Sequence, residues 1–127
     1  MIMTENEISF QIIGASIKLH KYLGPGMLES VYENALAFDL SKLGFRVEQQ
    51  VPIPFYYMEL KQQVGFRINL LVNKKVLIEI KSVENLVPVH YSQVLTYLRL
   101  SNLKLGLLIN FNCNYLKEGI HRLVNNL

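Results

Sequence analysis

The feature that most constrains this chain is a charged pair, Glu79 and Lys81, inside the second of two apolar runs that extend from Gly65 to Ser82. Both runs have the length and the β-branched, aliphatic composition of buried strands. A charge inside such a strand is costly unless it meets a partner, a metal ion or a ligand. The fold must therefore supply a partner for the pair, or leave it on a sheet face that meets water.

The loop between the two runs decides which residues share a face with the pair. Residues 73–75 predict a three-residue hairpin loop, and this register sets Asn69 opposite Glu79 and Arg67 opposite Lys81. A two-residue loop would instead move Asn69 to the face away from Glu79. The opposite face of the two strands is apolar and predicts a surface covered by helices, formed by Phe66, Ile68, Leu70, Val72, Ile78 and Ile80.

The remaining elements follow from apolar spacing and from chain-breaking residues. Spacings of three and four residues predict helices, whereas dense β-branched and aromatic residues predict strands. The resulting order, helices, then a meander, then a helix and a strand, indicates an α/β domain. The predicted helices span residues 5–23, 27–43 and 88–101; the predicted strands span residues 45–57, the two runs above and 103–111; a turn is expected at 59–63, and the tail allows a last strand near 120–124.

Composition narrows the class of protein. A chain of 127 residues, half of them apolar, predicts one packed domain over residues 1–127. No run approaches the roughly 20 apolar residues of a membrane-spanning helix, and the lone cysteine, Cys113, fits a reducing compartment, so we expect a cytoplasmic protein with no membrane partner. The net charge of +3 permits binding to nucleic acid without indicating it. A short apolar domain with prolines in an edge strand could also form a homodimer, although no particular residue indicates one.

Four short motifs occur in order along the chain: G-x-x-E-x-x-Y from Gly26 to Tyr32, E-x-K from Glu79 to Lys81, P-x-H from Pro88 to His90, and Q-x-x-x-Y from Gln93 to Tyr97. With these four motifs in this order, the chain resembles the GxxExxY family, a branch of the PD-(D/E)XK nuclease superfamily. The resemblance extends from about Ile8 to Ile109. The resemblance implies an α/β fold with a restriction-endonuclease-like core, in which a mixed sheet with an antiparallel meander is flanked by helices. It also implies a metal-dependent nuclease acting on DNA or RNA.

The same resemblance implies a role for each motif residue. Glu79, Asn69 and Glu29 would hold Mg²⁺ or Mn²⁺, and Lys81 would stabilise charge on the phosphate and orient water. Magnesium prefers carboxylate oxygens and water, and it neutralises charge in phosphoryl displacement. Because Tyr32 lies one helical turn from Glu29, a hydrogen bond between them is expected. The implied substrate contacts are Gln93, Tyr97, Tyr32 and His90.

The chain departs from the family pattern at one metal position. The family expects aspartate where this chain has Asn69, within the run from Phe66 to Val72. Asparagine keeps a carbonyl oxygen but loses the charge, so it would hold a metal more weakly. Natural loss of activity, an engineered substitution, and a site in which Glu29 and Glu79 suffice are the competing explanations. The alternative function is a catalytically inactive module that binds nucleic acid or another protein.

Overall fold

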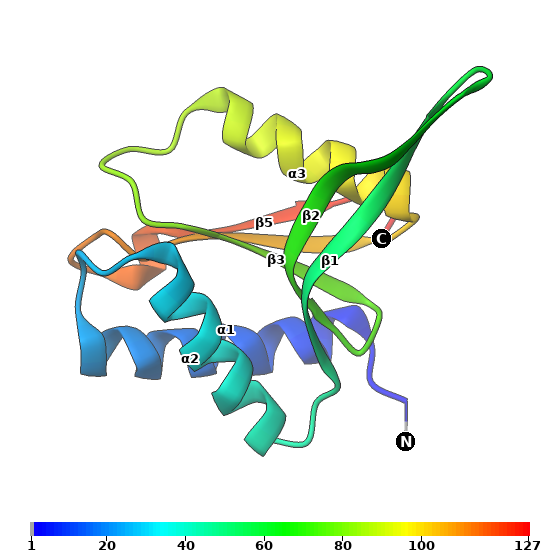
Figure 1. Cartoon of the computed structure of the whole chain (residues 1–127). Helices are drawn as coiled ribbons and strands as arrows, with labels where there is room; N and C mark the ends of the chain where they lie inside the picture. Colours follow the sequence, from blue (N-terminus) through cyan, green and yellow to red (C-terminus); the bar gives the residue numbers. More distant parts are fainter. Residues whose placement is uncertain (1) are drawn as a thin grey trace.

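The fold is a mixed sheet with helices on both of its faces (Figure 1). The computed structural model describes residues 2–127, apart from the side chains of residues 62–65. The five strands lie in the order β1-β2-β3-β4-β5, and all neighbours are antiparallel except β3 and β4, which the crossover through α3 makes parallel. This confirms the predicted order of elements. Their bounds are α1 Glu5–Leu23, α2 Glu29–Lys42, β1 Val47–Tyr57, β2 Leu60–Val72, β3 Val76–Lys81, α3 Pro88–Ser101, β4 Leu105–Asn110, a 3-10 turn Leu116–Glu118, and β5 Ile120–Val124.

Two apolar cores lie on the two sides of the sheet. One is formed by α1 and α2 against β3 and β4, with Ile8, Ile12, Leu36 and Leu40 fully buried in it. The other lies beneath α3, where Val94 and Leu98 pack on the opposite sheet face (Figure 1). The apolar residues of β3 therefore face one core or the other, and β3 and β4 are covered on both faces. No helix in the described part of the chain is long and apolar enough to cross a membrane.

The predicted three-residue loop between β2 and β3 is confirmed. β2 ends at Val72 and β3 begins at Val76, and these two residues pair with each other. Asn73 and Lys74 have φ angles of 52° and 54°, in the left-handed region that tight hairpin loops use. The loop therefore sets the register on which the site depends.

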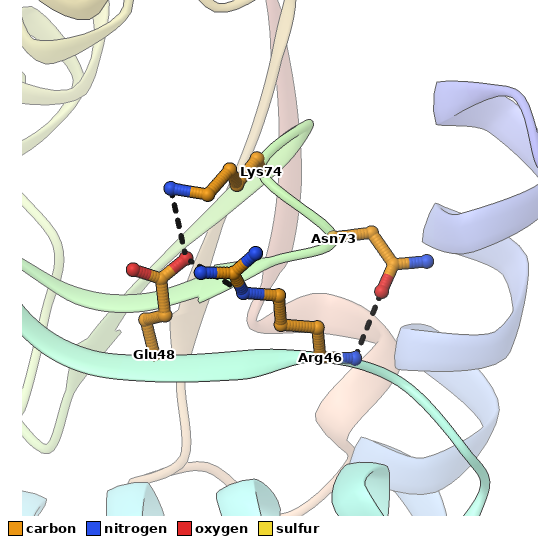
Figure 2. Close-up of polar contacts among 4 residues, drawn as sticks. All are labelled: Arg46, Glu48, Asn73 and Lys74. Atoms are coloured by element: carbon orange, nitrogen blue, oxygen red, sulfur yellow. Dashed lines mark hydrogen bonds and ion pairs between the residues drawn. The ribbon is translucent and has the colours of Figure 1, made fainter.

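This loop is also tied to the start of β1, as Figure 2 shows. The N–H of Arg46 donates to Oδ1 of Asn73 at 2.9 Å, and the N–H of Asn73 donates to the carbonyl of Arg46 at 2.8 Å. Glu48 lies 3.7 Å from both Arg46 Nε and Lys74 Nζ. Because both cationic side chains are exposed, these ion pairs contribute little stability, and the reciprocal hydrogen bonds hold the loop.

The apolar face predicted to be continuous is split between the two cores. Leu70, Val72, Ile78 and Ile80 face α1 and α2 as expected, but Ile68 and Phe66 pack beneath α3. The cause is a kink in the β1–β2 ribbon: the ladder pairs Gln49 with Leu70, then resumes at Ile68, and Gln50 between them has a φ of 53°. Side-chain alternation is therefore broken at Gln50 and Asn69.

The turn between β1 and β2 is shorter than predicted. It was expected over residues 59–63, yet β1 continues to Tyr57 and β2 begins at Leu60. Met58 takes a φ of 52°, which lets the chain reverse within two residues. The resulting β1–β2 hairpin extends well beyond the rest of the sheet (Figure 1).

Candidate functional site

The site lies where β2 separates from β3. Asn69 stands just beyond the paired part of the two strands, and its Oδ1 accepts the N–H of Ile80 at 2.8 Å. The predicted backbone pairs of Asn69 with Glu79 and of Arg67 with Lys81 are not formed in the described ladder, because β2 turns away here. The side chain of Asn69 bridges the gap and satisfies the N–H group that a continued ladder would have used.

Glu79 is a buried carboxyl group with an altered acidity. Its side chain is only 5% exposed, so the solvated-face interpretation is wrong for this residue. Burial is the largest cause that raises the pKa of Glu79 from 4.5 to about 7, and the negative charges of Glu29 and Glu33 raise it further. The positive charge of Lys81 and a hydrogen bond from the Asn69 backbone act in the opposite direction and lower this pKa. The charges of two further carboxyl groups and one amine therefore act on Glu79.

Lys81 lies at the carboxyl end of β3, beside the carboxyl end of the parallel strand β4. It is half-buried and pairs with Asn110. Ligands of open α/β sheets commonly bind at such an edge. An open pocket of about 540 Å³ lies beyond this edge and is lined by Gly26, Met27, Leu28, Glu29, Ser30, Ser82 and Asn112.

Glu29 is the first residue of α2, and it borders this pocket. Its Oε2 accepts the N–H of Ser82 at 3.4 Å, one residue beyond Lys81. The hydroxyl of Ser82 in turn donates to the carbonyl of Met27 at 2.6 Å. The start of α2 is thus fastened to the end of β3, which brings Glu29 to the same side of the molecule as the E-x-K motif.

Tyr32 supports the loop before α2. Its hydroxyl donates to the carbonyl of Gly24 at 2.6 Å and accepts the N–H of Met27 at 3.1 Å, and its ring stacks on Phe111 at 4.4 Å between centroids. The predicted hydrogen bond to Glu29 is not among the bonds of the described residues. The side chain is fully buried, and its contact with substrate stays a prediction.

Sequence reasoning missed Glu33, which lies in the same cluster. It is 6% exposed and accepts three amide hydrogen bonds, from Gln49 Nε2 at 3.1 Å, Gln50 Nε2 at 2.7 Å and Asn69 Nδ2 at 2.7 Å. The available signal was its position four residues after Glu29, which places both carboxylates on one face of a helix.

The residues predicted on α3 separate into two groups. Tyr97 is 8% exposed, and burial together with the charge of Glu79 raises its pKa, so it stands near the carboxyl cluster. Gln93 lies one turn before it and is half-buried. His90 instead accepts the N–H of Val87 on its Nδ1 at 3.0 Å, which satisfies a free donor at the start of the helix.

The donors at this site suit a hard cation. Among the described residues, no three His, Cys, Asp or Glu side chains stand close enough together to hold a metal ion by themselves. Mg²⁺ commonly binds through one or two carboxylates, with water completing its shell. The charges of Glu29 and Glu33 help to raise the pKa of the buried Glu79 carboxyl, and a divalent cation bound there would offset that repulsion. The residues therefore fit such an ion chemically.

Comparison with known proteins gives one match. A family model described as the PD-(D/E)XK nuclease superfamily matches residues 6–123, nearly the whole chain. No curated protein and no solved structure matches it. The matched range contains all the residues of the candidate site described above: Glu29, Glu33, Asn69, Glu79, Lys81, Gln93 and Tyr97.

Proposed function

The chain belongs to the PD-(D/E)XK nuclease superfamily, and on this basis we propose that it is a single-domain, metal-dependent nuclease that hydrolyses phosphodiester bonds in DNA or RNA. Members of this superfamily typically use divalent metals. The observation that carries the proposal is Glu79, a buried carboxyl group two residues before Lys81 at the separation of β2 from β3. Perturbed titratable groups of this kind concentrate at functional sites.

Within the superfamily we assign the chain to the GxxExxY branch. The structure supplies a physical reason for each position of that motif. Gly26 has a φ of 94°, which a side chain would resist, and Glu29 begins α2 beside the end of β3. Tyr32 bonds both sides of the loop that contains Gly26. The glycine and tyrosine of the motif therefore fix the loop that positions the carboxylate of Glu29.

The residues of the candidate site have distinct roles in the proposed reaction. A divalent cation, when bound, supplies charge neutralisation and lowers the pKa of a coordinated water. In its ionised form Glu79 would hold Mg²⁺ or Mn²⁺, and Glu29 would add a further contact. Lys81 places its amine against the negative charge of the phosphate. Tyr97 and Gln93 lie along α3 where a substrate would pass, and the free side of the His90 ring remains a predicted contact.

The test is cleavage of a mixed panel of DNA and RNA with Mg²⁺ or Mn²⁺. Glu79→Gln and Lys81→Met proteins should both lose the activity, whereas Lys104→Met, which removes an exposed amine elsewhere, should keep it. Far-ultraviolet circular dichroism establishes that the variants are folded. Cleavage that survives both changes at Glu79 and Lys81 refutes the proposal.

Asn69 favours a second candidate function, an inactive module that binds nucleic acid or a protein. Both ends of its amide group are engaged within the fold, by Ile80 and by Glu33. This candidate predicts no metal-dependent cleavage even after Asn69→Asp, and steep weakening of any nucleic-acid binding with salt. Cleavage by the unmodified protein excludes it.

A further inference from the structure

A second pocket lies near the first, which is the pocket at the end of β3 described above. It has a volume of about 380 Å³ and forms where the last turns of α1 meet the 3-10 turn that precedes β5 (Figure 1). The segment after β4 contributes to both pockets, since Asn112 lines the first and Asn114 lines the second. Two residues of chain span at most about 7 Å. The linings of the two pockets are therefore neighbours along this segment.

The second pocket is positively charged. Lys21 and Lys117 both line it, and none of its described lining residues is acidic. The ion pairs of the described residues involve neither amine. Glu118 follows Lys117 in the chain, but its charge acts on the thiol of Cys113, and neither of these two residues lines the pocket. Two lysines that meet in one hollow without a counter-charge favour an anionic ligand.

A buried histidine adds a polar group to the same pocket. His20 is 6% exposed, and its Nε2 lies 3.1 Å from the carbonyl oxygen of Phe111. A carbonyl oxygen can only accept, so Nε2 carries the hydrogen and donates. Among the described residues no hydrogen bond reaches the other ring nitrogen, Nδ1, and this atom is not fully enclosed by protein. His20 therefore has one nitrogen left for a ligand in the pocket.

The other walls of the pocket suit a nucleobase. Ile17 and Leu116 are apolar, and Tyr115 next to them is 73% exposed, so its ring is largely open to contact. Every base has a π-face, and stacking on an aromatic side chain is therefore tolerant of sequence. A volume of about 380 Å³ also falls within the range of small-ligand sites. Groups that suit a phosphate and a base thus occur together.

We propose that the second pocket binds one nucleotide of the nucleic-acid strand that occupies the first pocket, with Lys21 and Lys117 on its flanking phosphates and Tyr115 against its base. This inference rests on the proposed nuclease function. The continuous segment from Asn112 to Lys117, which lines both pockets in turn, supports a continuous strand as the occupant. Contacts to phosphates and to a stacked base add affinity and orientation without selecting a sequence.

The test is the salt dependence of binding to labelled single-stranded DNA and RNA of about 12 nucleotides, measured by fluorescence anisotropy with a chelator that prevents cleavage. For single strands, the slope of log affinity against log salt is about −0.7 per phosphate contact. Lys21→Gln and Lys117→Gln should each make this slope shallower by about 0.7. Tyr115→Leu should weaken binding by about fivefold or more and leave the slope unchanged. Lys104→Gln, an exposed amine before the opposite end of β4, should change neither quantity.

A purely structural role for Lys21 gives a different result. This residue lies in the last turn of α1, where a cation stabilises the helix. If that were its whole role, Lys21→Gln would lower the free energy of unfolding in urea and leave the salt slope unchanged. An unchanged slope in both lysine variants therefore overturns the inference, whereas the nuclease proposal stands if cleavage still depends on Glu79 and Lys81.

Two further outcomes also count against the inference. Adenosine monophosphate that binds the unmodified protein but not the lysine variants, while oligonucleotide binding is the same in all, assigns the pocket to a free nucleotide and overturns the strand. Failure of the unmodified protein to bind any oligonucleotide overturns it as well. The cleavage panel then decides the nuclease proposal separately, because that assay depends on Glu79 and Lys81 and not on this pocket.

Discussion

Replacing Glu79 by glutamine should make the metal-free protein more stable at alkaline pH. Burial raises the pKa of Glu79 from 4.5 to about 7, so the folded state favours the neutral acid. The stability associated with that proton is fully present below 4.5 and is lost as the pH rises through about 7. Each pKa unit corresponds to about 1.4 kcal/mol, which gives a loss of about 3 kcal/mol. Glutamine cannot ionise and should not incur this loss.

Urea unfolding of the unmodified and Glu79→Gln proteins, with a chelator at about pH 4 and about pH 8.5, measures the difference in free energy of unfolding directly. The two free energies of unfolding should be similar at the lower pH, and the variant should be the more stable by about 3 kcal/mol at the higher one. Magnesium at the higher pH should stabilise the unmodified protein, because the cation binds the ionised carboxylate. A difference between the proteins that is the same at both pH values refutes this reasoning.

Three further substitutions probe the supports of the site. Tyr32→Phe removes the hydroxyl that bonds the loop before α2 and should lower the free energy of unfolding by about 1–3 kcal/mol, measured in urea. Gly106→Ala would place a Cβ 2.9 Å from Cγ1 of Val94, so the Val94 side chain or its surroundings must shift, and a loss of about 1–3 kcal/mol is expected by the same assay. His90→Ala removes the acceptor at the start of α3 and should lower the free energy of unfolding by about 1 kcal/mol, seen in thermal melts.

Much of the fold was predictable because the local signals agree with the tertiary structure. The start of α1 shows this: Thr4 accepts from the N–H of Glu7, the side chain of Glu7 accepts from the N–H of Thr4, and apolar residues follow at helical spacing. The loop after Val72 likewise set three pairs of the β2–β3 register. In both places the residues of one short segment determine the conformation of that segment.

The separation of β2 from β3 was not predictable from local signals. Gln50 adopts a positive φ that its residue type does not favour, and strand alternation therefore misplaced Ile68 and Phe66. Glu33 was missed for a related reason, since its partners Gln50 and Asn69 are distant in the sequence and meet it only through the kink. Where tertiary contacts override local preference, the sequence pattern alone points to the wrong face.

The most direct test of the account is the position of Mn²⁺ in crystals of the unmodified protein, located by anomalous diffraction. We predict a peak within about 2.5 Å of a carboxylate oxygen of Glu79, a distance typical of a hard cation and oxygen. Manganese bound only elsewhere, with Glu79 untouched under conditions that ionise it, would contradict the assignment of this cluster as a metal-dependent nuclease centre.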